Sequence, residues 1–271
     1  MDPPVAMTIA GSDSGGGAGL QADLKTFAAH GVFGTSVVTA VTAQNSAEVR
    51  GVVPIDPDFV ELQIDTVVAD LPVAAVKTGM LASSATVAAV ARWAAAGRLP
   101  NLVVDPVLVA STGRPLLDAG GVEAYLRLLL PHALVATPNT REAGLLTDTV
   151  VDDVESMVRA ARRLADTGAR AVVVKGGHLG GDHAPDVVLV EGELHVLDGR
   201  RLVSANDHGT GCTLSAATAA LLARGVELLE ALAQAKAFVR TAMAGSSTWH
   251  LGAGHGPLDH FGWGPVSPPG S

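Results

Sequence analysis

The feature that most constrains the fold is an alternation of short apolar runs with longer stretches rich in Ala and Leu. The short runs are apolar on both faces, which is typical of parallel strands covered by helices on both sides. We expect strands at residues 5–10, 36–42, 75–78, 102–105, 134–137 and 171–175. We expect helices at residues 19–30, 57–69, 83–96, 121–130 and 151–167.

The pattern changes after residue 180, where three closely spaced runs at 187–190, 194–197 and 201–204 predict an antiparallel hairpin and an edge strand. Two helices, at 210–223 and 228–247, complete the chain. The order of elements predicts a single three-layer α/β/α domain over residues 1–261, with a mostly parallel central sheet and antiparallel edge strands. Residues 262–271 are rich in Gly, Pro and Ser, and we expect them to form a flexible tail.

Composition excludes several classes of protein. The 18 Lys and Arg residues against 27 Asp and Glu residues give a net charge of −9, which argues against binding to duplex nucleic acid or to an anionic membrane. The only cysteine, Cys212, cannot form an internal disulfide. We see no signal peptide and no apolar run long enough to span a bilayer, so we expect a cytoplasmic protein.

The sharpest local motif is His208-Gly209-Thr210-Gly211-Cys212-Thr213, which opens an Ala-rich helix. Glycines let backbone N–H groups turn inward, and the helix N-terminus adds partial positive charge, so the motif suits an anion. The same field would lower the pKa of the Cys212 thiol and favour the thiolate. The alternative is a simple turn into a helix, with Cys212 as a small buried apolar residue.

A second glycine-rich loop, residues 11–19, follows the first predicted strand. It matches neither the P-loop pattern nor a well-placed dinucleotide fingerprint. It could let the backbone approach a small ligand, with Asp23 one turn into the next helix, or it could be only a flexible turn in which Asp13 is a capping residue.

Two polar groups lie where a buried strand ends. Asn139 and Glu142 are three residues apart, and an amide oxygen with a carboxylate suits a hydrated Mg²⁺. By spacing alone, a helix N-cap with its capping-box Glu is the stronger interpretation. Lys175, before two glycines, could reach phosphates or simply end its strand, and Asp105 could orient metal-bound water or cap a turn.

Together these segments resemble one family, the hydroxymethylpyrimidine/phosphomethylpyrimidine kinases of thiamine synthesis, within the ribokinase-like superfamily. The resemblance covers about residues 5 to 261. The matching segments are 7–13, 19–26, 42–46, 77–81, 105–107, 137–139 with Glu142, 175–178, 208–216 and 256–261.

The resemblance implies a ribokinase-like fold and an ATP- and Mg²⁺-dependent kinase that phosphorylates 4-amino-5-hydroxymethyl-2-methylpyrimidine and then its monophosphate. An amide such as Gln44 can donate to the ring nitrogen and accept from the amino group of a 4-aminopyrimidine at once. By similarity the rest of the substrate pocket is lined by Gly11, Ala18, Asp23, Met80 and Val107.

At the phosphate end, the resemblance implies that the backbone N–H groups of Gly209, Thr210, Gly211 and Cys212 form an anion hole. A Cys212 thiolate could accept the hydroxyl proton as a base, and a nucleophilic role through a phosphocysteine is the alternative. Phosphoryl transfer depends mostly on positioning and charge neutralisation. The implied ATP-binding residues are Lys175, Asn139, Glu142 and Lys236, and the implied Mg²⁺ ligands, mostly through water, are Asn139, Glu142 and Asp105.

Three alternatives remain open. Pyridoxal or pyridoxine kinases share the loop and the cysteine, a catalytically silent pyrimidine-binding protein would keep the pocket, and a dinucleotide-dependent dehydrogenase is disfavoured by the spacing of the first glycine loop. The resemblance also implies a homodimer. Residues 110–115 and the loop after His178 are candidate closing elements.

Overall fold

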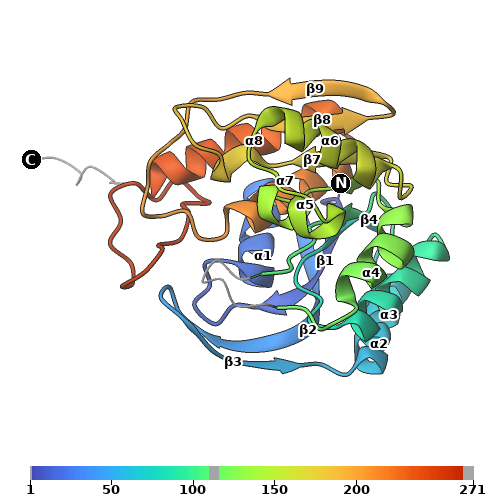
Figure 1. Ribbon diagram of the computed structural model, residues 1–271. Helices are drawn as coiled ribbons and strands as arrows, with labels where there is room; N and C mark the ends of the chain where they lie inside the picture. The colour runs from blue at the N-terminus through green and yellow to red at the C-terminus, as the bar shows by residue number, and fades with distance from the viewer. Residues whose placement is uncertain (1, 110–115, 265–271) are drawn as a thin grey trace, which may run out of the picture.

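The computed structural model describes residues 2–109 and 116–264, and their central element is a nine-stranded sheet (Figure 1). The predicted closing segment at 110–115 and most of the predicted tail lie outside these residues. The strands are β1 (Val5–Ser12), β2 (Phe33–Gln44), β3 (Val49–Pro54), β4 (Val73–Thr78), β5 (Val103–Val104), β6 (Val135–Ala136), β7 (Ala171–Val174), β8 (Asp186–Val190) and β9 (Glu193–Leu197).

The sheet has the order β3-β2-β1-β4-β5-β6-β7-β8-β9. The six strands from β2 to β7 pair in parallel, whereas β3, β8 and β9 pair antiparallel with their neighbours. Antiparallel strands therefore form both edges, and the sequence predicted the β8–β9 hairpin at one of them. The carboxyl ends of the parallel strands meet at one side of the sheet, where ligands bind in folds of this type.

Helices cover both faces of the sheet (Figure 1). They are α1 (Gly19–Ala29), α2 (Pro57–Asp70), α3 (Ser84–Ala95), α4 (Gly121–Ala124), α5 (Thr140–Thr147), α6 (Val154–Ala165), α7 (Thr210–Ala223) and α8 (Leu228–Gly245). One buried cluster joins the sheet to α2, α3, α5 and α6, and a second joins its other face to α1, α7 and α8. Consecutive strand residues such as Val103 and Val104 belong to opposite clusters, so the strands are buried on both faces, which gives three layers.

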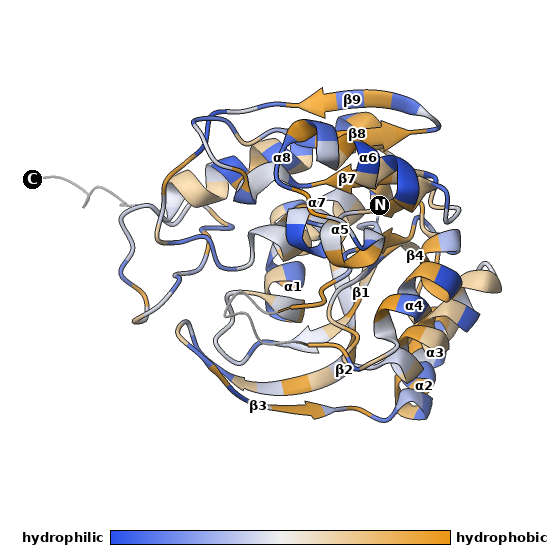
Figure 2. Cartoon of the chain, in the orientation of Figure 1, coloured by the Kyte–Doolittle hydropathy of each residue, from blue (hydrophilic) through white to orange (hydrophobic). Residues whose placement is uncertain are grey.

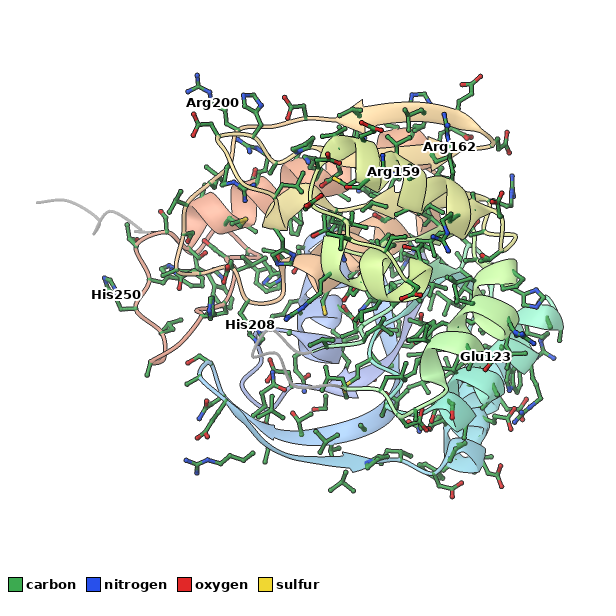
Figure 3. All side chains as sticks on the ribbon, viewed as in Figure 1. Glu123, Arg159, Arg162, Arg200, His208 and His250 are labelled. Carbon is green, nitrogen blue, oxygen red and sulfur yellow. The ribbon has the colours of Figure 1, made fainter. Side chains whose placement is uncertain are left out.

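Two helices illustrate how local sequence sets this arrangement (Figures 2 and 3). The outer helix α6 buries Met157, Ala161 and Leu164, whereas Arg159 and Arg162 on its other face are exposed, so it is amphipathic. Helix α7 is buried around its whole circumference from Thr213 to Leu222, with small alanines and a few hydroxyl residues, and lies between the sheet and α8. Its alanines let the neighbouring elements pack closely.

Three expectations about the elements need correction. The edge strand β3 was not predicted, because Val49–Pro54 has weak alternation and lies two residues before a helix cap. Residues 201–204 form no strand, since the Arg201 guanidinium binds the carbonyls of residues 177, 179, 181 and 183 and draws the segment away from β9. The helix expected at 121–130 is α4, followed by a π-helical turn at Tyr125–Leu129 and a 3₁₀ turn at Leu130–His132, where Pro131 ends it.

No helix among residues 2–109 and 116–264 is both long and apolar enough to cross a membrane.

Candidate active site

A cavity of about 590 Å³ opens at the carboxyl ends of the strands. Each parallel strand from β1 to β7 contributes to it through a residue at or just beyond its end, and the N-terminus of α7 closes one side. The strand-end residues are Gly11, Gln44, Lys77, Asp105, Asn139 and Lys175, and α7 contributes residues 209–212. The fold thus brings together segments that are far apart in the sequence.

The two glycine-rich loops are joined by Asp13. Its carboxylate accepts hydrogen bonds from the backbone N–H groups of Gly15 (2.8 Å), Gly17 (3.1 Å) and Ala18 (2.8 Å), and its Oδ2 lies 3.1 Å from His208 Nε2. Burial would raise the pKa of Asp13, but the bonds from His208 and the backbone lower it below its usual value. Asp13 is therefore an anionic cap that also binds the second loop, and His208 is the partner on that loop (Figure 3).

The loops approach each other at backbone distance. Gly209, the N-cap of α7, has a φ of +86°, and a Cβ at this position would lie 2.0 Å from the carbonyl oxygen of Gly17. Only glycine fits both the left-handed conformation and the contact.

The start of α7 has the geometry of an anion site. Gly211 lies so close to Lys175 that a Cβ there would be 3.2 Å from Nζ. The N–H of Thr210 is directed toward the carbonyl of Asp207 at 3.3 Å, so this member of the predicted anion hole already has a partner. The first turn of α7 and the Lys175 ammonium together provide positive potential at one point of the cavity.

Cys212 behaves differently from the prediction. Burial raises the pKa of its thiol to about 11, and the carboxylates of Asp23 and Asp105 add to the increase, although the Lys77 ammonium and a hydrogen bond from the Gly19 N–H oppose it. The expected thiolate near neutral pH is therefore wrong for the protein without ligands. The helix terminus is outweighed because the half-buried thiol is largely shielded from water and two carboxylates lie near it.

Asp105 and Lys175 form the floor of the phosphate end. Lys175 Nζ lies 2.9 Å from Asp105 Oδ1, and the hydroxyls of Thr137 and Ser215 donate to the same carboxylate, both at 3.2 Å. Burial alone would raise the pKa of Asp105, but the ammonium groups of Lys175 and Lys77 lower it. This carboxylate is thus ionised and positioned by three groups, Lys175, Thr137 and Ser215.

Asn139 and Glu142 form the capping box that the spacing favoured. The Asn139 side chain accepts from the Glu142 N–H at 2.9 Å, and Glu142 Oε2 accepts from the Asn139 N–H at 2.8 Å. Burial raises the pKa of Glu142 to about 7, and Asp105 adds to the increase while Lys175 opposes it. The capping bonds fix the orientation of both side chains, and both side chains line the cavity.

These acidic groups fit a cation that keeps most of its water. Two buried carboxylates and one amide lie around the Lys175 end, and a divalent ion would favour the charged form of Glu142, whose pKa is raised by burial and, to a smaller extent, by the Asp105 charge. Within residues 2–109 and 116–264, no three His, Cys, Asp or Glu side chains converge as a ready-made metal cage. The donor set suits Mg²⁺ held partly by phosphate oxygens and water, rather than an all-protein metal site.

Lys236 also lines the cavity, but its ammonium is engaged. Nζ lies 2.7 Å from the Ala184 carbonyl and 2.7 Å from Asp186 Oδ2, and Asp186 accepts the Gly176 N–H at 2.9 Å. Lys236 therefore connects α8 to β8 and to the turn after Lys175, as well as facing the cavity.

At the opposite end of the cavity, Gly11, Ala18, Gln44, Met80 and Val107 line the wall as predicted. A Cβ at Gly11 would lie 2.3 Å from the Met80 methyl group, so the glycine leaves room for this side chain.

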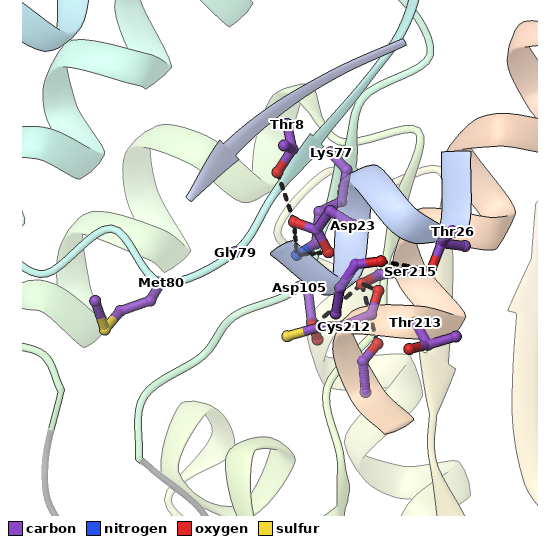
Figure 4. A network of polar contacts seen from close by, with 12 residues as sticks. Thr8, Asp23, Thr26, Lys77, Gly79, Met80, Asp105, Cys212, Thr213 and Ser215 are labelled. Carbon is purple, nitrogen blue, oxygen red and sulfur yellow. Dashed lines mark hydrogen bonds and ion pairs between the residues drawn. The ribbon is translucent and has the colours of Figure 1, made fainter. Parts of the chain in front are cut away.

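Asp23 differs from the prediction. It is fully buried and is not part of the cavity wall, and its carboxylate binds the Lys77 ammonium and the Thr8 hydroxyl behind that wall (Figure 4).

Beyond Lys175 and Lys236, the basic residues of the wall were not predicted from the sequence. Lys77 lies at its floor, and further basic side chains line it near the nucleotide end that the resemblance implies: Arg141, His178, Arg200, Arg201 and Arg240. A lysine within the apolar run of β4 was a usable signal for Lys77, because such a residue needs a buried partner. Nothing in the local pattern marks the others.

Comparison with known proteins agrees with this geometry. The profile of the family described as phosphomethylpyrimidine kinase matches residues 13–259. The hydroxymethylpyrimidine/phosphomethylpyrimidine kinase of Rhizobium meliloti is 49% identical over 259 residues, which cover 95% of this chain and 97% of the relative. The thiamine biosynthesis bifunctional protein ThiED of Geobacter sulfurreducens is 47% identical over 94% of this chain, which matches 52% of that longer protein.

Among solved structures, the pyridoxal kinase of Staphylococcus aureus in complex with ADP superposes with a TM-score of 0.89 at 35% identity, covering 98% of this chain and 96% of that one. The fold is therefore common to two kinds of vitamin kinase, whereas sequence identity is higher to the pyrimidine kinases. The chain belongs to the phosphomethylpyrimidine kinase family.

Proposed function

We propose that this protein transfers the γ-phosphoryl group of ATP to 4-amino-5-hydroxymethyl-2-methylpyrimidine and then to its monophosphate, as a step in thiamine biosynthesis. The observation that carries the proposal is one cavity lined by Gln44 at one end and by Lys175 and the N-terminus of α7 at the other. The hydroxyl oxygen attacks the γ-phosphorus, the bond to the ADP oxygen breaks, and the hydroxyl proton passes to water.

The Gln44 end recognises the ring. Its amide donates to the ring nitrogen beside the amino group and accepts from that amino group, a pairing that one side chain makes only when it carries both a donor and an acceptor. Met80 and Val107 contact the faces of the ring, and Gly11 and Ala18 let the backbone come close. The hydroxymethyl group then points toward Cys212, which lies next to the reacting oxygen as a neutral thiol.

The other end holds the phosphates. Backbone N–H groups of Gly209, Gly211 and Cys212, with Thr210 completing the turn, face the transferred group, and Lys175 neutralises its charge. Lys236 lies near the nucleotide. Bound Mg²⁺ would neutralise charge on the phosphate oxygens, and Asn139, Glu142 and Asp105 would hold it, mostly through water.

We also propose a cytoplasmic homodimer with one kinase domain over residues 1–261 and a tail at 262–271. The resemblance to the family supports the dimer, and the absence of a possible internal disulfide agrees with a reducing compartment.

ADP release tests the proposal. Purified protein with ATP and Mg²⁺ is compared on the aminopyrimidine alcohol, its monophosphate and pyridoxal, with a sample containing EDTA as the metal-free control. We expect turnover of both pyrimidines, and loss of turnover in EDTA.

A clear preference for pyridoxal would overturn the substrate assignment while keeping the phosphate end. This second candidate deserves the comparison because of the structural similarity to the S. aureus pyridoxal kinase.

A further inference from the structure

An ion pair with no exposed side-chain surface lies at the floor of the cavity, where Lys77 borders the cavity and Asp23 lies behind it. Lys77 Nζ is 2.9 Å from Asp23 Oδ1 and 2.8 Å from Asp23 Oδ2, and the Thr8 hydroxyl donates to Oδ2 at 2.6 Å. Both charged side chains are 0% exposed. Figure 4 shows the pair where β1, β4 and α1 meet, with Cys212 and Asp105 beside it.

The local backbone leaves room for the ammonium group. Lys77 is the charged residue of an otherwise apolar strand, and Gly79 follows it, where a Cβ would lie 2.8 Å from Nζ. Buried ion pairs are weak contributors to stability, because desolvation of both charges offsets their attraction. Stability alone is therefore a poor explanation for this pair.

The Lys77 ammonium is directed toward the reacting end of the site. Lys77 belongs to the cavity wall together with Cys212 and Asp105. Burial would lower the pKa of Lys77, but Asp23 raises it, with further contributions from Cys212 and Asp105, so the side chain stays charged. At Cys212 the positive charge of Lys77 opposes the two carboxylates. Lys77 is thus a permanent cation within electrostatic range of the acceptor position.

We propose that Lys77 is a positioning residue for phosphoryl transfer: its buried ammonium, fixed by Asp23, supplies positive charge behind Cys212 and the acceptor hydroxyl. Lys175 neutralises charge on the phosphates of the nucleotide, and Lys77 supplies positive charge near the hydroxyl group that accepts the phosphoryl group. The assignment rests on the proposed kinase function for its catalytic consequence, but its electrostatic effect on Cys212 exists without substrate. A preorganised charge in a site without water stabilises developing negative charge most effectively.

The test is a double variant, Lys77→Met with Asp23→Asn. It removes both charges and keeps an acceptor for the Thr8 hydroxyl, so it avoids the uncompensated carboxylate that a single Lys77 substitution would leave. The matched control is Thr26→Val, a buried polar substitution in the same helix that leaves every charge in place.

We expect the double variant to lose about 10–100-fold in kcat, with the KM for the aminopyrimidine within about threefold of wild type. A second readout needs no substrate: the rate of iodoacetamide alkylation between pH 8 and 10. Cys212 is the only cysteine, so the rate reports on that thiol alone. The double variant loses the Lys77 charge, which lowers the pKa of Cys212, together with the Asp23 charge, which raises it. Because the Lys77 effect is the larger, alkylation at a given pH should slow by about twofold to threefold. Thr26→Val should match wild type in both measurements.

A folded double variant with wild-type kcat would overturn the proposal, and so would an alkylation rate equal to that of wild type. An inactive wild-type protein would count against the proposed function instead, and the alkylation rates would still decide whether Lys77 acts on Cys212.

Discussion

Among the lysine–aspartate pairs at the carboxyl ends of the sheet, the pairs of Lys77 and Lys175 differ in their access to the cavity. Lys77 and Asp23 are 2.8 Å apart and both are 0% exposed, whereas Lys175 and Asp105 are 2.9 Å apart with 12% and 1% of their side chains exposed. The separations are nearly equal, so the strength of the contact does not distinguish the pairs. The difference lies in what else each ammonium can reach.

A sealed ammonium cannot exchange its partner for a ligand. Lys77 can therefore influence chemistry only through its charge, while Lys175 can turn from Asp105 to an incoming phosphate. A lysine paired with an aspartate can thus act in two ways, and the burial of its ammonium group decides between them.

The largest expected effect comes from breaking the sealed pair on one side only. Lys77→Met leaves the Asp23 carboxylate buried without its cation, and we expect a loss of about 3–5 kcal/mol in the free energy of unfolding. Urea denaturation at pH 7.5 measures it. The double variant with Asp23→Asn should recover most of the loss, and equal stability of the single and double variants would contradict this account.

Breaking the open pair should change activity more than stability. Lys175→Met removes the charge that we place at the phosphates, and we expect kcat/KM to fall by about 10²–10³-fold, with a higher KM for ATP. Steady-state kinetics with ATP varied at saturating aminopyrimidine measures it. Arg170→Met, which removes a cation at the surface far from the cavity, is the control and should stay within about twofold of wild type. A kcat/KM within threefold of wild type for Lys175→Met would remove Lys175 from this role.

A third prediction concerns a buried group that has no ionised partner in contact. Burial, and then the charge of Lys25, lowers the pKa of His260 to about 4 from an ordinary 6.5. The unfolded chain therefore binds a proton that the folded protein does not bind between these values. The stability contribution is complete above pH 6.5 and is lost as the pH falls toward 4, by about 3 kcal/mol at most.

Urea denaturation from pH 4.5 to 7 tests the His260 prediction. His260→Gln keeps a polar partner for the Thr213 hydroxyl and should flatten the dependence in this window. An unchanged slope in that variant would mean that another group titrates.

The architecture was largely predictable from the sequence. Parallel strands buried on both faces, such as Ala171–Val174, carry a plain signal because every residue is apolar, and the capping box of Asn139 and Glu142 follows from spacing. The edge strand β3 and the segment at 201–204 were not predictable, because their conformations depend on contacts with other segments of the chain and not on a local pattern.

The site was predictable as a set of residues but not in its electrostatics. Gln44, Lys175 and Gly209–Cys212 lie on one cavity, as the resemblance implied. The pairing of Lys77 with Asp23 spans 54 positions, and the acidity of Cys212 depends on how deeply two other segments bury it. Both depend on how segments far apart in the sequence pack together in three dimensions, and local sequence patterns do not show this.

The contact between Asp13 and His208 also has a consequence for biosynthesis, since it joins residues 195 positions apart. At about 5–20 residues per second, the ribosome needs about 10–40 s to reach His208 after Asp13 has been made. During this interval β1 can pair with β2 and β4, but Asp13 in the loop after β1 still lacks His208 as its partner. The phosphate site is therefore among the last parts of the molecule to form during translation, and a growing chain that already holds most of its sheet has no functional centre.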